Sequence, residues 1–211
     1  MRYKDIIRGG LGLLLLFSLM GCQDLFTRSA FAWAATDPSD MSAAQLKTYA
    51  EGLVKAGNKD AMAEAYAALV EKLPDDAADD PELYLLASDL AMGGSGLPGA
   101  MVEAVSLLAT FDPDEPGDME DTIQALIDGI DGDLLAGSVT QFAAVAALED
   151  GAAETITETQ YTNAAVAQLF VIYQGTPDPA DITDDPRFSQ VEEWALLGGM
   201  DLDSFTDLLG A

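Results

Sequence analysis

Carboxylates are the most abundant reactive side chains of this chain, in which Asp and Glu together number 37, Cys occurs once and His is absent. Paired carboxylates can carry out glycoside hydrolysis, but acids this frequent form pairs by chance everywhere, so spacing singles out no catalytic pair. The absence of His excludes a Ser-His-Asp triad, a Cys-His pair and any zinc site that includes His. We therefore expect no catalytic residue, no dedicated metal site and no cofactor, and we interpret the chain as a protein that is not an enzyme.

One acidic segment has part of the spacing of an EF-hand calcium loop. Its acids are Asp112, Asp114, Asp118 and Glu120. Gly117 stands at the sixth place of such a loop, but the twelfth place is Ile123 instead of the bidentate Glu. The segment predicts weak, non-specific Ca²⁺ binding and no dedicated calcium site.

The net charge narrows the class of partner. Lys and Arg number only 9, and the formal net charge is −28. Binding to nucleic acid depends on Lys and Arg that neutralise phosphates, so this charge argues against a nucleic-acid partner. The acidity indicates either adaptation to a saline habitat or a cation-binding surface.

The N-terminus has the pattern of a secretory signal peptide. Arg2, Lys4 and Arg8 form a basic segment, and a mostly apolar run follows from Leu11 to Met20. This run is shorter than the roughly 20 residues that a membrane-spanning helix needs. A basic segment followed by a short apolar run is typical of a secretory signal.

The sequence Leu19-Met20-Gly21-Cys22 directly after this run resembles the lipobox of bacterial lipoproteins. The resemblance implies that residues 1–21 are removed and that Cys22 carries diacylglycerol, which holds the protein to a membrane. Gln23 in place of the Asp that often retains such proteins at the inner membrane indicates the periplasmic face of the outer membrane. The alternative is a soluble secreted protein cleaved near Ala34-Ala35.

Beyond the signal, residues 22–40 show no sustained period and are typical of a flexible tether, whereas residues 41–211 predict an all-α domain of about eight helices. The first apolar stripe consists of Leu46, Tyr49, Ala50, Leu53 and Val54. Asp40 or Ser42 is expected to cap the start of that helix, and Gly57 to end it. We also expect a later helix to end at the Gly93-Gly94-Ser95-Gly96 sequence, and Trp194 to lie in the core.

Two segments, residues 43–76 and 80–113, resemble tetratricopeptide (TPR) units of about 34 residues. The matching positions are Leu46, Tyr49, Ala50, Leu53, Gly57, Met62, Tyr66, Leu69 and Pro74 in the first segment, and Leu83, Leu86, Ala87, Leu90, Gly94, Met101, Val105, Leu108 and Pro113 in the second. The resemblance implies a TPR-like antiparallel helix-hairpin array, an α-solenoid whose neighbouring hairpins share a core. A generic array of α-hairpins is the alternative, and residues 117–211 either continue the repeat or form a separate cap.

A TPR-like array implies a concave groove lined by the first helix of each unit. The residues expected to bind a partner there are Lys47, Glu51, Lys55, Tyr84, Ser88 and Met92. The alternative is that Lys47 and Lys55 form i,i+4 ion pairs with Glu51 on a solvated face.

These observations predict a membrane-anchored lipoprotein that acts as a non-catalytic scaffold for protein–protein interactions in the bacterial cell envelope. Its partner is expected to be a protein or peptide. The alternative function, which the TPR resemblance also implies, is that of an accessory lipoprotein in a periplasmic solute-binding or transport system, with a cleft for a small ligand. A carboxylate-based hydrolase is the third hypothesis.

Overall fold

The structure is a computed structural model that describes residues 37–110, 119–148, 155–175 and 179–200. The chain divides into two compact units, Met1–Met41 and Ser42–Ala211. In the first unit, the described residues form a short 3-10 helix, η1 (Pro38–Asp40), which Asp37 caps by accepting from the Ser39 N–H. The predicted signal sequence, Cys22 and most of the tether lie outside the described residues, as do Asp112, Asp114, Gly117 and Asp118.

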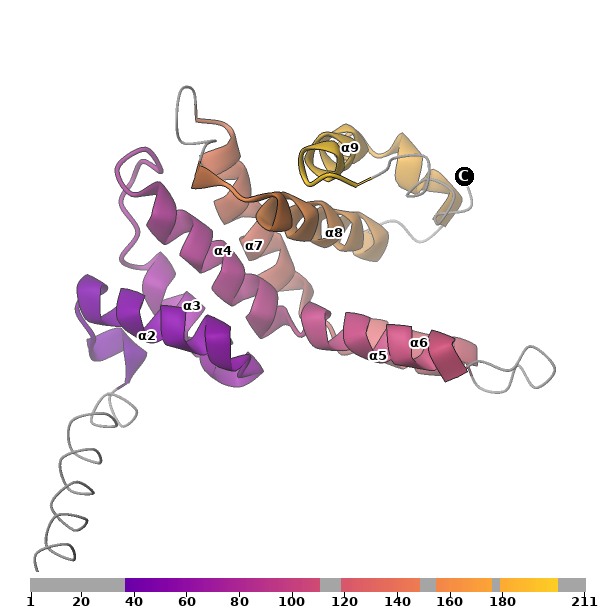
Figure 1. Ribbon diagram of the computed structural model, residues 1–211, viewed down its shortest axis with the longest axis horizontal. Coiled ribbons are helices and arrows are strands. Elements are labelled where there is room, and N and C mark those ends of the chain that lie inside the picture. The colour runs from indigo at the N-terminus through magenta and orange to yellow at the C-terminus, as the bar shows by residue number, and fades with distance from the viewer. Residues whose placement is uncertain (1–36, 111–118, 149–154, 176–178, 201–211) are drawn as a thin grey trace, which may run out of the picture. The chain divides into compact units, whose positions relative to one another are not determined.

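Within its described residues, the second unit has eight α-helices and no strand (Figure 1). The helices are α2 (Ala43–Ala56), α3 (Lys59–Val70), α4 (Pro81–Ser95), α5 (Leu97–Thr110), α6 (Met119–Asp128), α7 (Gly132–Ala146), α8 (Glu158–Gly175) and α9 (Phe188–Leu197), with a 3-10 helix η3 (Pro179–Asp184) before α9. The predicted all-α class and the number of helices are therefore confirmed. None of the helices in the described ranges is long and apolar enough to cross a membrane.

The ends of α2 follow from local sequence. Ser42 and Gln45 form a capping box, in which the Ser42 oxygen accepts from the Gln45 N–H and the Gln45 side chain accepts from the Ser42 N–H. Gly57 ends the helix in the left-handed conformation, with φ of 68°. Of the two expected caps, Ser42 is the one used, and the expected end at Gly57 is confirmed.

Helix α4 lies at the centre of this unit and packs against α2, α3 and α7, most extensively against α7 (Figure 1). The contact with α7 includes a buried polar pair, because the Ser88 hydroxyl donates to the Ser138 carbonyl at 3.0 Å. Only Gly96, with φ of 86°, separates α4 from α5. The two helices of the segment 80–113 therefore do not pack along one another as a hairpin, and the TPR-like arrangement is not confirmed.

Helix α4 ends within the expected Gly93-Gly94-Ser95-Gly96 sequence, at its last residue. The helix continues through Gly93, Gly94 and Ser95 and ends only at Gly96. A Cβ on Gly94 would lie 2.9 Å from the backbone nitrogen of Ala63, so only glycine allows α3 to approach α4 this closely. Burial against α3 thus offsets the conformational cost of glycine within a helix.

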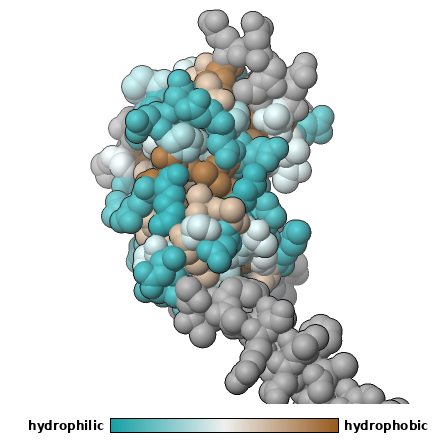
Figure 2. Space-filling model, turned by 90° about the vertical axis from the view of Figure 1, so that its left-hand side faces the viewer, coloured by the Kyte–Doolittle hydropathy of each residue, from teal (hydrophilic) through white to brown (hydrophobic). Residues whose placement is uncertain are grey.

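The main core joins α7, α8 and α9 through three aromatic rings. Phe142 forms edge-to-face contacts with Tyr161, at 5.3 Å between ring centroids, and with Trp194, at 4.9 Å. Trp194 is 3% exposed, which confirms its predicted place in the core. Figure 2 shows one face of the molecule, on which hydrophilic residues cover most of the surface and apolar residues gather near the middle.

Candidate functional site

The three charged residues predicted to bind a partner lie on α2, but only one of them has a described partner. Lys47 Nζ lies 2.9 Å from Glu82 Oε2 at the start of α4, and this hydrogen bond is the main cause that raises the pKa of Lys47. The expected i,i+4 partner of Lys47, Glu51, makes only a minor Coulombic contribution to that pKa. Glu51 and Lys55 are both exposed.

The three predicted residues on α4 are largely withdrawn from solvent. The Tyr84 hydroxyl donates to the Pro74 carbonyl at 2.7 Å, and Ser88 is buried against α7. Met92 is 9% exposed and lines a cleft on another side of the helix. The structure therefore does not gather the six residues on one surface, and their role in partner binding stays a prediction.

The cleft that includes Met92 has a volume of about 800 Å³. Its walls come from six helices: the end of α2, the starts of α3, α5 and α8, the end of α6 and one face of α4. Its volume lies in the range of small-molecule sites, and most of its lining is apolar, with a few polar side chains. We therefore take it as the candidate functional site.

One face of α4 forms the floor of the cleft. Asp89, Met92, Gly93 and Gly96 all line it, and their spacing of three, four and seven residues places them on the same side of a helix. At Gly93 the absent side chain leaves room for Met62 of α3, whose thioether occupies the place of a Cβ. Along α4, the floor therefore begins with the Asp89 carboxylate and continues with the apolar residues Met92, Gly93 and Gly96.

A hydrogen-bonded turn at Ser95 keeps the α5 side of the cleft open. The Ser95 hydroxyl donates to the Met92 carbonyl at 2.6 Å and accepts from the Leu97 N–H at 3.2 Å. The Ser95 carbonyl accepts from the Asp131 N–H at 2.9 Å, which ties the turn to the start of α7. These bonds, with the left-handed Gly96, direct α5 away from α4 and leave space between them.

The start of α8 supplies the polar wall. Thr157 and Gln160 form a capping box, in which Gln160 Oε1 accepts from the Thr157 N–H at 3.0 Å and the Gln160 N–H donates to the Thr157 hydroxyl at 3.3 Å. Because the box uses the Gln160 side-chain oxygen, the side-chain amide NH₂ is the group that donates to the Asp89 carboxylate. The cap therefore orients the one described hydrogen-bond partner of Asp89.

Lys59 closes the opposite end of the cleft. Its ammonium group lies beside Gly96 and donates to the Gly129 carbonyl at 3.2 Å. Gly129 directly follows α6, so the ammonium group interacts favourably with the negative end of that helix dipole. Lys59 therefore has a structural role that joins α3 to the end of α6.

Asp89 has a raised pKa, whereas the pKa values of Asp37, Glu82 and Asp185 are lowered. Burial in the cleft raises the pKa of Asp89 to about 6, and the hydrogen bond from Gln160 acts in the opposite direction. A carboxyl group that is perturbed in this way and lies in a cleft is typical of a functional site, although structural groups can be perturbed as well.

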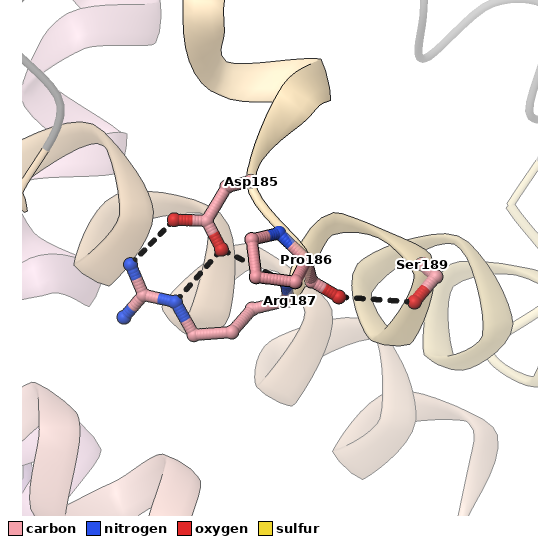
Figure 3. Close-up of polar contacts among 4 residues, drawn as sticks. All are labelled: Asp185, Pro186, Arg187 and Ser189. Carbon is pink, nitrogen blue, oxygen red and sulfur yellow. Dashed lines mark hydrogen bonds and ion pairs between the residues drawn. The ribbon is translucent and has the colours of Figure 1, made fainter.

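A second aspartate, Asp185, is perturbed in the opposite direction just before α9 (Figure 3). Its carboxylate accepts from Arg187 Nε at 2.9 Å, from the Arg187 terminal nitrogen at 2.8 Å and from the Arg187 backbone N–H at 2.8 Å. These bonds lower the pKa of Asp185 to about 2. Ser189 extends the turn by donating to the Pro186 carbonyl, so this network stabilises the start of α9.

Sequence reasoning did not single out Asp89, although the sequence carries a signal for it. Asp89 is the only charged residue between Glu82 and Glu103, in a chain where acids are otherwise frequent. An isolated acid in an apolar helix is either buried with a partner or placed at a site. The same reasoning does not find Gln160, because its approach to Asp89 depends on how α8 packs.

Metal ligands do not gather in the described part of the chain. No group of three or more Asp, Glu, Cys or His side chains there is placed to hold a metal ion. Most of the acidic segment predicted to bind Ca²⁺ weakly lies outside the described residues, so that prediction stays a prediction.

Comparisons with protein-family models, with curated proteins and with solved structures returned no match. The geometry of the cleft and the sequence patterns are therefore the basis for a functional proposal.

Proposed function

We propose that this protein is a lipid-anchored lipoprotein of the bacterial cell envelope whose helical body holds a small organic ligand in the Asp89 cleft. It binds this ligand without transforming it, as an accessory of a solute-binding or transport system. The observation that carries the proposal is the cleft of about 800 Å³ with one desolvated carboxylate on an otherwise largely apolar floor.

The resemblance to TPR units supports the proposal for residues 43–76. Helices α2 and α3 pack against each other, and both contact α4, as consecutive helices do in a helical-repeat array. The end of α2, the start of α3 and one face of α4 line the cleft, so the repeat-like part of the chain also builds the binding site.

The test is to purify the full chain from native membranes and to identify the small molecules it retains by mass spectrometry. Ala125→Trp fills the cleft from α6, because Ala125 is exposed and lines it. Ala67→Trp is the matched control, since Ala67 is exposed on α3 outside the lining. We expect wild type and Ala67→Trp to retain the same molecule and Ala125→Trp to lose it. Equal retention by both variants, or none by wild type, contradicts the proposal.

The membrane anchor has a separate test. Labelled palmitate supplied to growing cells should appear on the wild-type protein and not on Cys22→Ser. Fractionation should then place the labelled protein in the outer membrane. A wild-type protein without label would instead support the soluble secreted form.

Protein–protein binding is a second candidate function, and exposed apolar residues on α5 favour it. Val102 is 73% exposed and Met101 is 44% exposed, which is unusual for adjacent large apolar residues unless a partner covers them. On this hypothesis, Val102→Asp abolishes recovery of a membrane protein crosslinked in intact cells, whereas Ala67→Asp, at an exposed position on α3, leaves it unchanged.

A further inference from the structure

Asp89 is a partly buried carboxyl group to which the described part of the chain supplies no cation. Its side chain accepts from Gln160, and no Lys or Arg is among the groups that shift its pKa. Lys47 and Arg187 are paired elsewhere, with Glu82 and Asp185. Because a carboxylate withdrawn from water without a counter-ion is costly, a cation that enters the cleft is favoured at this place.

The cation that already lines the cleft does not fill this role. Lys59 lies beside Gly96, which follows Asp89 by seven residues along α4. Seven residues of helix correspond to about 10 Å, and the Lys59 ammonium donates to the Gly129 carbonyl there. The cleft therefore has Asp89 at one end of its floor and the Lys59 ammonium group at the other.

Between these two ends the floor is apolar and adaptable. Met92 is 9% exposed, Met62 is 4% exposed, and the Met62 thioether lies against Gly93. Methionine side chains are flexible and polarizable, so they accommodate apolar ligands of varied shape. This stretch suits the hydrocarbon body of a ligand whose charged group is at Asp89.

The lining also indicates which kind of cation fits. A site for quaternary ammonium is typically a cage of aromatic rings, and no aromatic residue is among the described residues of the lining. Calcium takes six to eight oxygen ligands, whereas the described residues include no group of three acids that could hold a metal. A carboxylate that accepts from Gln160, in a cleft that Asn163 also lines, suits an ammonium group that has N–H donors.

Building on the ligand-binding function proposed above, we infer that the cleft binds a primary ammonium ion with an apolar body of up to about 10 Å. The ammonium group donates to the Asp89 carboxylate, and the body lies against Met62 and Met92. The net charge of −28 concentrates such cations near the protein at low ionic strength.

The test uses the full chain in lipid nanodiscs and isothermal titration calorimetry, with empty nanodiscs as the blank. The probes are n-hexylammonium, 1-hexanol and hexyltrimethylammonium, which share one chain and differ only in the head group. We expect n-hexylammonium to bind at least about tenfold more tightly than either of the others. It alone combines a positive charge with N–H donors, whereas 1-hexanol is uncharged and the quaternary ion has no donor.

Two variants assign the effect to one carboxylate. Asp89→Asn should weaken n-hexylammonium binding by about tenfold and leave 1-hexanol binding unchanged. Glu103→Gln removes an exposed carboxylate of the same cleft and should change the affinity by less than about twofold. Circular dichroism of each variant verifies the fold.

Each contrary outcome overturns the inference in a distinguishable way. If 1-hexanol binds as tightly as n-hexylammonium and Ala125→Trp abolishes both, the cleft binds ligands but does not select an ammonium group. If Asp89→Asn has no effect, or the quaternary ion binds best, Asp89 is not the anchor. If no probe binds, the inference is wrong, and if the purified protein also retains no molecule, the ligand-binding function fails with it.

Discussion

The cleft around Asp89 and the turn around Asp185 shift the pKa of the same kind of side chain in opposite directions. The pKa of Asp89 is raised to about 6 because burial in the cleft removes water and no cation replaces it. The pKa of Asp185 is lowered to about 2 because Arg187 donates three hydrogen bonds to it. The ordinary value for both is 3.8, so the difference arises from the surroundings alone.

The origin of the two surroundings differs as well. The partner of Asp185 is two residues away, within the turn that starts α9. The cleft that contains Asp89 is lined by α3, α6 and α8, which are distant from Asp89 in the sequence, as well as by α5. A local contact stabilises the charged form of an acid, whereas a tertiary cleft destabilises the charged form and keeps it available for a ligand.

The largest expected effect comes from Asp89→Asn, measured by denaturant unfolding at pH 4 and pH 8. Because the folded-state pKa of Asp89 lies above its unfolded value, its ionised form destabilises the fold, and this destabilisation grows as the pH rises through about 6. We expect the variant to be more stable than wild type by about 2 kcal/mol at pH 8 and equally stable at pH 4.

Two other charged side chains, Lys59 and Glu103, are among the described residues that line the cleft. Glu103→Gln is the matched control. It should leave the difference between pH 4 and pH 8 unchanged. Asp185→Asn should have the opposite sign, because a lowered folded-state pKa contributes stability that is lost as the pH falls through about 2. Equal stability of wild type and Asp89→Asn at pH 8 would contradict the account of Asp89.

Thr157→Ala is expected to have a smaller effect and to connect the cleft to the cap of α8. Loss of the hydroxyl removes the acceptor of the Gln160 N–H, which should lower the free energy of unfolding by about 1 kcal/mol. The Gln160 side chain keeps its bond from the backbone N–H of residue 157 but loses the bond from the Thr157 hydroxyl. It is then less firmly oriented towards Asp89, so the pKa of Asp89 should rise further. Denaturant unfolding and carboxyl-carbon NMR titration measure the two effects.

Thr140→Ala is the control for this variant. The Thr140 hydroxyl donates to the Ala136 carbonyl within α7, on an exposed face, so its loss should change neither the titration of Asp89 nor, to any large extent, the stability. If Thr157→Ala leaves the Asp89 titration unchanged, the capping box does not orient Gln160.

Arg187→Lys is expected to have the smallest effect on stability. It tests how far the lowered pKa of Asp185 depends on the geometry of the guanidinium group. Lysine keeps the positive charge but loses the two-pronged geometry with which the guanidinium donates to both carboxylate oxygens. The pKa of Asp185 should therefore rise towards its ordinary value in an NMR titration. An unchanged titration would show that the Arg187 backbone N–H, at 2.8 Å, suffices to hold it low.

Much of the secondary structure could be predicted from the sequence. The apolar period predicted helices throughout residues 41–211, and the cap at Ser42 and the stop at Gly57 follow from contacts within a few residues. The predicted end of α4 within Gly93-Gly94-Ser95-Gly96 is confirmed, although the helix runs through Gly93 and Gly94 and ends only at Gly96. Glycine ends a helix only where no other interaction compensates for its flexibility. In α4 the close approach of α3 at Gly94 provides that compensation.

The pairing of helices was harder to predict. The sequence order suggested that α4 pairs with α5, whereas α4 packs mainly on α7. An apolar stripe shows that a helix face is buried but does not specify which helix buries it. The six residues assigned to a partner-binding groove depended on that pairing, which explains why Ser88 lies buried against Ser138.

Features whose causes are local or additive follow directly from the amino-acid sequence. These are the strong negative charge, the helical class, the capped start of α2 and the Asp185–Arg187 turn, since each depends on composition or on residues a few positions apart. The raised pKa of Asp89 follows from the packing of the helices, because desolvation depends on how many atoms of other segments surround the carboxyl group. The same isolated acid between Glu82 and Glu103 would be an ordinary surface carboxylate if α3, α5, α6 and α8 packed elsewhere.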